Sequence, residues 1–570
     1  MASDSLIGRS PGRPASFDDY VIRRTGDAQR DKSVTRVPLR TRGAWLLRVN
    51  RLYGASEEWR NLTSFSGELR NRLLIQQSPA TVSRWERGQS AFPFAAVRGY
   101  ESVLELQPYS LVAVLDTVFR YHGPTGVALP WLRRGRCEAH VAGETTREIL
   151  YRVVSDEPLA GSDWDDLSVL AAAHPRTMAT IRADWWAQAT HRLLLESMIS
   201  DGVSWMLRFE ALNRFLTAPL IGPAAVDAVR SAVDDRQVQS LVGTASLFDA
   251  SASPEASAHV LRYLRGAEDD RIFKGAMMAC VRKIRFGHFH AAELENISRV
   301  VADAADSGGM DLNEETRALA VSVLGQIPAA FQHARGQRVL RAAGSQRDRI
   351  SLVGDNRLVS AEIAATVARR VADHAASHVS HAGEQFVDPV LPLLIEEALF
   401  DPVFDARLYA NSLIYATPYR QWVAQALTAE LSAARRNGDA LMLTTLYESL
   451  RKLGGPRERA LIEATVLEPG TPTAATDTAA YALGHVGGSS DDLFWSRALE
   501  LHTAGWAKSA STVSASVLDR LVYAIGMANG RGVLRSVCEA RGIPPKVKES
   551  ALWWLGHPPS LMASRKCIVR

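Results

Sequence analysis

The sequence predicts an all-α fold, in which five short helices precede a large array of further helices. Ala and Leu dominate long stretches of the 570 residues, and this composition favours helix over sheet. Apolar residues recur at helical spacing, and no convincing run of alternating strand character interrupts them. Short turns containing Gly, Pro, Asp or Ser separate the helical stretches. A chain of this length is too long for one hydrophobic core, so we expect two or more domains.

The first five helices are expected within residues 41–123. Residues 1–40 are polar and rich in Arg and Pro, which predicts a flexible basic arm. After it, Trp45 and Val49 lie at helical spacing and open a first helix that Gly54 ends. The other four helices are predicted near residues 64–73, 78–89, 92–106 and 108–123.

The rest of the chain is expected to hold a linker with a first helix at 124–150 and a helical-repeat domain for sensing or oligomerisation at 151–570. A short sequence pattern recurs in residues 151–570: small or apolar residues, then Leu or Ile, then Gly. Its glycines include those at 484, 526 and 556. A period of this size, built of paired helices, is typical of an α-solenoid. The pattern resembles HEAT or armadillo repeats, in which the Gly closes each inner helix. An irregular helical domain without true repeats is the alternative.

Charge and composition limit the class of protein. Residues 1–123 contain 18 Arg and Lys against 12 Asp and Glu, whereas the remainder is close to neutral, with 48 against 50. The basic excess therefore lies where a polyanion would bind. The four cysteines form no C-x-x-C pair, the start has no signal-peptide pattern, and no window has the apolar length of a membrane span. We expect a soluble cytoplasmic protein, nucleoid-associated, without a membrane partner.

Residues 78–88 predict a short, sharply bounded helix. Ser78 is a good N-cap and Pro79 is favoured at the first helical position. Val82 and Trp85 make a buried stripe, and Gly88 ends the helix. The residues expected to face away from that stripe are Ala80, Thr81 and Arg84. A helix with small and hydrogen-bonding residues at its start can enter the DNA major groove.

This segment resembles the recognition helix of the XRE family, the Cro and phage-repressor-like helix-turn-helix proteins. The match is carried by Val82, Ser83, Arg84, Glu86, Arg87 and Gly88, and by Tyr100, Leu104 and Leu106 in the following helix. The resemblance implies that Gln77, Ala80, Thr81 and Arg84 meet base edges or the nearest backbone, that Ser83 and Arg87 lie near phosphates, and that Glu86 pairs with a basic neighbour. With the N-cap Ser78, these make the candidate DNA-binding segment. The turn before the helix is about two residues longer than in the family, and a helical hairpin without a DNA role is the alternative.

Two further arginines are candidate DNA contacts. Arg13, in Gly12-Arg13-Pro14, resembles half of an AT-hook, whose arginine enters a narrow minor groove; a plain disordered tail is the alternative. Arg48 in the first helix, with Arg51 beside it, could contact phosphate, or could lie idle on a solvated helix face.

Other constellations favour neither a metal site nor an enzyme. His374, His378 and His381 would share one helix side and could bind Zn²⁺ or form a pH-sensitive patch, but a solvated polar face is the simpler interpretation. The second cluster is His288, His290 and Glu293. Carboxylate pairs at 165–166, 269–270 and 491–492 are more simply helix N-caps than acid/base pairs. Without a phosphate-binding loop or a catalytic motif, the sequence predicts no catalytic residue, no metal and no cofactor.

The resulting expectation is a sequence-specific DNA-binding transcriptional regulator with a helical-repeat domain that binds an effector, peptide or protein partner. A single helix-turn-helix contacts only four or five base pairs, roughly, so a homodimer on paired half-sites is expected on double-stranded DNA. The rival hypothesis is a helical-repeat scaffold for protein–protein assembly, whose small N-terminal domain docks on protein.

Overall fold

The computed structural model describes residues 37–54, 56–73, 77–123, 138–266, 269–306, 314–345, 358–379, 388–469, 471–509 and 512–569. Throughout these ranges the regular structure is helical, with no strand, so the predicted all-α class is confirmed. None of the described helices is long and apolar enough to cross a membrane.

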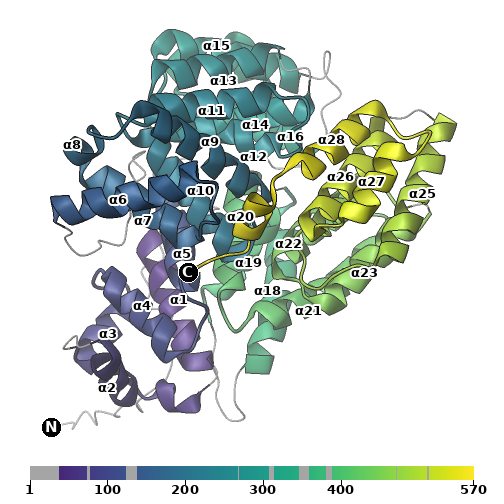
Figure 1. The fold of residues 1–570 in the computed structure, drawn as a ribbon. Coiled ribbons are helices and arrows are strands. Elements are labelled where there is room, and N and C mark those ends of the chain that lie inside the picture. The colour runs from purple at the N-terminus through teal and green to yellow at the C-terminus, as the bar shows by residue number, and fades with distance from the viewer. Residues whose placement is uncertain are drawn as a thin grey trace.

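The N-terminal unit contains the five predicted helices. They are α1 (Leu39–Tyr53), α2 (Leu62–Leu73), α3 (Pro79–Glu86), α4 (Phe94–Val103) and α5 (Ser110–His122), with the short 3₁₀ helix η2 (Glu57–Arg60) after α1. Helix α2 packs against α3 and α4, while α1 packs against α3 and α5. In Figure 1, α2 and α3 lie at one edge of the molecule.

A first group of helices follows the unit. Its members are α6 (Ala139–Val154), α7 (Gly161–Ala173), α8 (Pro175–Met178), α9 (Ala183–Ile199), α10 (Gly202–Thr217), α11 (Gly222–Asp234), α12 (Leu241–Ser246), η3 (Leu247–Ala250), α13 (Pro254–Gly266), α14 (Asp270–Arg285), α15 (Ala291–Ala305), α16 (Glu314–Gln326), η4 (Ala329–Phe331) and α17 (Ala334–Ser345). Alternate helices form contacting rows: α9, α11, α13 and α15 make one, and α12, α14 and α16 make another.

The second group repeats this arrangement more regularly. It comprises α18 (Ala361–Val379), α19 (Leu391–Phe400), α20 (Phe404–Tyr415), α21 (Arg420–Asn437), α22 (Ala440–Leu453), α23 (Pro456–Leu467), α24 (Thr473–Ala482), α25 (Asp492–Ser509), α26 (Thr512–Ala528), α27 (Arg531–Glu539), α28 (Pro545–Gly556) and α29 (Pro559–Ser564). Helices α20, α22, α24, α26 and α28 contact one another in order, and α21, α23, α25 and α27 do the same beside them.

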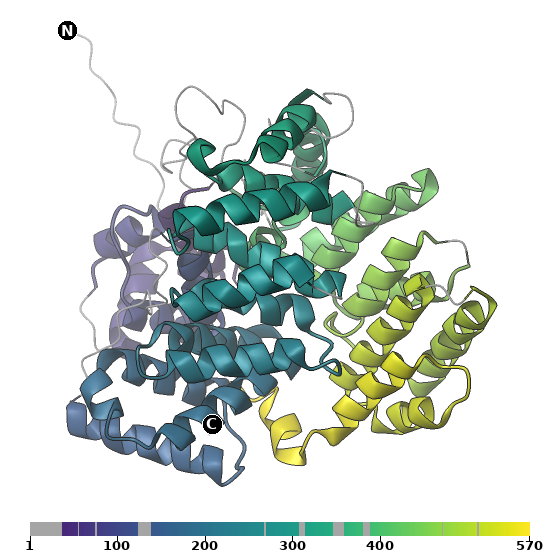
Figure 2. The ribbon, with the colours of Figure 1, turned by 90° about the horizontal axis from the view of Figure 1, so that it is seen from above.

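The chain end returns to the first group. The backbone N–H groups of Gly161 and Ser162 donate to the carbonyls of Cys567 and Ile568 at 2.8 and 2.9 Å, and the Arg208 guanidinium donates to the Ser564 carbonyl at 2.7 Å. Figures 1 and 2 show the yellow C-terminal segment crossing to the blue helices. The two groups are thereby joined at both the chain connection and the C-terminus.

Two of the recurring glycines serve close packing between neighbouring helices. A Cβ atom at Gly526 would lie 2.1 Å from Cδ2 of Trp554, and one at Gly484 would lie 3.1 Å from Cε1 of Tyr523. The expectation that the glycine closes each inner helix is wrong for Gly526, which lies inside α26. Its lack of a side chain instead makes room for the indole of α28.

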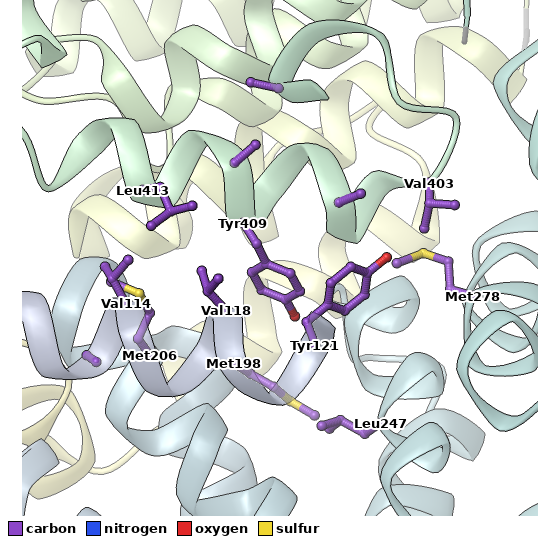
Figure 3. Close-up of a cluster of buried hydrophobic side chains, with 14 of the residues drawn as sticks. Val114, Val118, Tyr121, Met198, Met206, Leu247, Met278, Val403, Tyr409 and Leu413 are labelled. Atoms are coloured by element: carbon purple, nitrogen blue, oxygen red, sulfur yellow. The ribbon is translucent and has the colours of Figure 1, made fainter. Parts of the chain in front are cut away.

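The N-terminal unit shares its hydrophobic core with both groups. Helix α5 is buried along almost its whole length, and Figure 3 shows Val114, Val118 and Tyr121 packed between Tyr409 and Leu413 on one side and Met198 and Met206 on the other. No break in packing separates residue 122 from the helices that cover it.

Candidate nucleic-acid interface

Helix α3 begins and ends as its sequence predicts. The Ser78 hydroxyl accepts a hydrogen bond from the Thr81 backbone N–H at 3.2 Å, and Pro79 occupies the first helical position. At the other end Gly88 adopts φ +67°, and its N–H donates to the Trp85 carbonyl at 3.0 Å. The left-handed conformation at Gly88 favours glycine and turns the chain out of the helix.

One side of α3 is buried and the other faces solvent. Val82 and Trp85 are buried, as predicted, and anchor the helix in the core of the unit. Ala80, Arg84 and Arg87 are exposed, at spacings of four and three residues that place them on one side. Among the remaining candidates Ser78 is exposed, and Gln77, Thr81 and Ser83 are half-buried. The structure therefore brings the seven α3 candidates together.

The helices that pack against α3 carry two further exposed arginines. Arg70 of α2 and Arg40 at the start of α1 are exposed. The Arg40 carbonyl lies 3.5 Å from where a Cβ on Gly88 would stand, which places the first turn of α1 beside the end of α3. Across the described part of the chain, no carboxylate forms an ion pair with Arg40, Arg70, Arg84 or Arg87. We call these four arginines and Ala80 the α3 surface.

Glu86 locks the end of α3 to the rest of the unit. Its carboxylate accepts from Nε and Nη2 of Arg51 at 2.6 and 2.7 Å and from the Tyr100 hydroxyl at 2.7 Å. Both members of the ion pair are almost fully buried, at 2% and 3% exposure. Burial and the Glu86 carboxylate raise the pKa of Tyr100 well above its usual value. The prediction that Glu86 pairs with a basic neighbour is confirmed.

The expectation that Arg48 and Arg51 could contact phosphate from a solvated face of the first helix is wrong. Arg48 is 8% exposed and Arg51 is 2% exposed. Every residue of α1 from Thr41 to Leu52 is buried, because other helices of the unit and the helices of the second group cover it from all sides. Arg51 stabilises the fold through its ion pair with Glu86. Neither arginine lies on the solvent-exposed side of α3.

Helix α1 is fastened to the second group by polar contacts. Arg42 Nη1 donates to Glu397 Oε1 at 3.0 Å, and Trp45 Nε1 donates to Asp388 at 2.7 Å. Asn50 adds a hydrogen bond to the Ala416 carbonyl at 2.8 Å. Helix α1, which packs against α3, is therefore held to the second group of helices by hydrogen bonds.

Helix α5 is fastened to the first group by buried ion pairs. Arg120 Nε donates to Glu210 at 2.8 Å, and Asp116 accepts from Arg214 at 3.0 Å. Arg285 donates to the carbonyls of Tyr121 and His122 at the end of α5, at 3.2 and 3.0 Å. The unit that carries α3 therefore contacts both groups of helices through charged side chains.

The histidine constellations form no metal site in the described ranges, where no group of three possible ligands lies together. His378 Nδ1 lies 2.8 Å from the His374 carbonyl oxygen, and its ring stacks on Trp422 with centroids 4.3 Å apart. His288 and His290 lie in the turn between α14 and α15. His381 and Arg13 lie outside the described residues, as do most of residues 1–40 and segment 124–137.

Two of the three carboxylate pairs are N-caps, as predicted. Asp269 accepts from the Arg271 N–H at 2.9 Å, and Asp491 accepts from the Phe494 N–H at 2.7 Å. The prediction is wrong for Asp165, which lies inside α7 and forms a buried ion pair with Arg214 at 2.6 Å. Only the tertiary packing of α10 on α7 supplies that partner.

Sequence reasoning gave no role to Arg40 and Arg70. The basic excess of residues 1–123 was the available signal, but it does not say which arginines remain exposed and unpaired. Comparison of the chain with family models, curated proteins and solved structures finds no match.

Proposed function

We propose that this protein is a sequence-specific transcriptional regulator that binds double-stranded DNA with α3. The observation that carries the proposal is the α3 surface, a capped helix at the edge of the molecule with Ala80 and Arg84 one turn apart on its exposed side. Arg84 and Arg87 at α3, and Arg40 and Arg70 on the helices packed against it, are exposed and form no ion pair within the described ranges. Exposed arginines without carboxylate partners suit a polyanion, and a short side chain at the start of the helix permits close approach to a groove.

The proposed roles follow from position. Arg84, whose guanidinium lies 3.3 Å from the Thr81 hydroxyl, would hydrogen-bond a base edge together with Thr81, and Ala80 and Gln77 would lie against neighbouring bases. Ser83, Arg87, Arg40 and Arg70 would contact phosphates, which fixes register but carries no sequence information.

The resemblance of residues 78–106 to XRE-family proteins supports this proposal independently of the charge argument. Because one such unit reads few base pairs, we propose that two copies bind paired half-sites as a homodimer in the cytoplasm. The alternating rows of helices are proposed to be HEAT-like repeats that offer a surface to a peptide or protein partner.

The contacts of α1 with the second group and of α5 with the first group offer a way to regulate DNA binding. A change in the packing of α10 would move α5 through the Arg120–Glu210 ion pair, and a change in α19 would move α1 through the Arg42–Glu397 pair. Either movement would be passed on to α3. A rigid connection of this kind transmits a displacement, whereas a flexible tether would absorb it.

Selection of bound sequences from random double-stranded DNA tests the proposal. We expect an enriched site, and Arg84→Ala should weaken binding to it by roughly 10- to 100-fold while scrambled DNA changes less. Arg87→Ala should weaken all sequences alike and reduce the salt dependence of binding. Arg497→Ala, which removes the same charge from the exposed side of α25, is the matched control and should bind normally.

If selection enriches no sequence and Arg84→Ala leaves DNA binding unchanged, the regulator proposal fails. The α3 surface would then be a candidate for docking on protein, as in the scaffold hypothesis.

A further inference from the structure

Two adjacent cations in the last turn of α22, Arg451 and Lys452, differ from the other buried cations of the protein. They are 9% and 8% exposed. Elsewhere a buried cation donates to a carboxylate, as Arg208 does to Glu196, or to a backbone carbonyl, as Lys283 does to Ser251. Within the described ranges Arg451 and Lys452 have no carboxylate within 4 Å and no side-chain hydrogen bond.

Aromatic rings hold the Arg451 guanidinium. Its Cζ lies 5.3 Å from the ring centroid of Phe404 in α20 and 5.1 Å from that of Tyr481 in α24. These contacts fix the position of the cation without neutralising its charge. The N–H groups of the planar guanidinium therefore remain available to hydrogen-bond another acceptor.

Lys452 is held in the same way from a different direction. Its Nζ lies 5.4 Å from the ring centroid of Tyr415 in α20 and 5.6 Å from that of Trp205 in α10. Burial lowers the pKa of Lys452, and Arg451 and Arg420 lower it further while Asp201 opposes the shift. A bound anion would stabilise the ammonium form of Lys452 in this position.

Two acidic groups in the surroundings make their closest polar contacts with other residues. The Asp201 carboxylate lies 3.3 Å from Nδ1 of His485, and Asp477 accepts from Arg520 at 3.3 Å. Arg520 in turn lies 4.7 Å from the Tyr481 ring on which Arg451 rests. Asp201 offsets the charge of Lys452 in part through space, but no carboxylate of the described residues contacts either cation, and Arg520 adds a further positive charge nearby.

We propose that Arg451 and Lys452 form a binding site for the phosphate group of a small ligand. Taking a charge out of water without a partner is costly, so two such charges side by side indicate a missing counter-ion. A phosphate monoester carries close to two negative charges at neutral pH, and an arginine fork matches its oxygens. The charged atoms of both side chains are not among the fully enclosed polar atoms, so they keep some contact with solvent.

The site lies where the two groups of helices meet. Lys452 belongs to the second group and its ring partner Trp205 to α10 of the first, the helix whose Glu210 pairs with Arg120 of α5. Figure 1 shows α22 between the teal helices and the yellow ones. A ligand bound there would bridge the two groups, and this binding does not depend on whether α3 reads DNA.

Phosphorus NMR titration of the full-length protein with inorganic phosphate tests the site. We expect saturable broadening of the phosphate signal, with Kd raised at least tenfold by Arg451→Met or by Lys452→Met, which keep most of the apolar stem. Arg497→Met is the matched control and should bind phosphate as the natural protein does. Chloride at equal ionic strength corrects for general salt effects.

Thermal unfolding in phosphate-free buffer supplies a second readout. Because each substitution removes an unpaired buried charge, Tm of Lys452→Met should equal or exceed that of the natural protein, and phosphate should raise Tm only where both cations are present. Absence of saturable binding, or an affinity that neither substitution changes, would mean an adventitious ion only and overturn the proposal. A lower Tm for both variants would identify purely structural cations and overturn it as well.

Discussion

Replacing Glu86 by Ala removes the group that holds α3 in place. The carboxylate accepts three hydrogen bonds of 2.6–2.7 Å, two from Arg51 and one from Tyr100. Without it, the buried Arg51 guanidinium loses its carboxylate partner but keeps its bonds to the carbonyls of Trp59 and Arg60, at 2.9 and 2.8 Å. Breaking a buried ion pair by deleting one partner costs about 3–5 kcal/mol, because the other charge stays buried.

Native-state hydrogen exchange of α3 measures this cost. A loss of 3–5 kcal/mol lowers amide protection by roughly a hundredfold to a few thousandfold, up to the limit set by the local opening free energy. Glu86→Gln keeps an acceptor oxygen and should give a smaller loss. Glu68→Ala is the matched control, because the partly exposed Glu68–Arg72 pair of α2 contributes about 0–1 kcal/mol.

The reasoning is refuted if Glu86→Ala changes α3 protection by no more than Glu68→Ala does. It is also refuted if protection falls equally in distant helices such as α25, since the contacts of Glu86 predict a loss centred on α1, α3 and α4.

Three further predictions concern packing, pH and capping. Gly526→Ala should lower the free energy of unfolding by about 1–3 kcal/mol or more, because the new Cβ would overlap the Trp554 ring. Gly325→Ala in α16 is the control: a Cβ there meets open space, so the free energy of unfolding should stay unchanged or rise by up to about 1 kcal/mol. Thermal unfolding of the two variants measures the difference. Burial, with repulsion from Asp249, raises the pKa of Asp405 to about 6, so its protonated form is favoured by folding, and this stability is present below about pH 4 and is lost as the pH rises to about 6. Asp405→Asn should therefore flatten the stability profile between these pH values and raise the free energy of unfolding at pH 7 by about 1–3 kcal/mol; an unchanged profile would contradict the assignment. Ser78→Ala should cost α3 about 1 kcal/mol, seen as a roughly fivefold loss of protection at its first turn, with no change in α25.

Much of α3 could be predicted from sequence alone. Its N-cap, first-position proline, buried stripe and terminal glycine are local signals, because each acts within one or two turns of the residue concerned. Glu86 was assigned a structural role through a family resemblance, yet its partner Arg51, 35 residues earlier, was identified only by the structure.

Arg48 and Asp165 show where such signals fail. Arg48 belongs to a helix whose spacing is compatible with one solvated side, but neighbouring helices cover every side of it. Asp165 sits beside Asp166 in a pair that suits a helix start, but it lies within α7, where Arg214 of α10 compensates its buried charge. Periodicity reports the largest apolar stripe of a helix and cannot report how many neighbours that helix has.

The sequence by itself determined the helical class, the bounds of α3 and the side of α3 that faces solvent, since propensity, capping and 3.6-residue periodicity are properties of short segments. Tertiary structure decided which arginines stay unpaired. Arg51, Arg120 and Arg208 meet carboxylates from other helices, whereas Arg84 faces solvent and Arg451 rests between aromatic rings. From the sequence alone, these five arginines cannot be told apart. The carboxylate partners of Arg51, Arg120 and Arg208 lie 12 to 90 residues away in sequence. The energy of each charge depends on the groups and the solvent that packing brings to it.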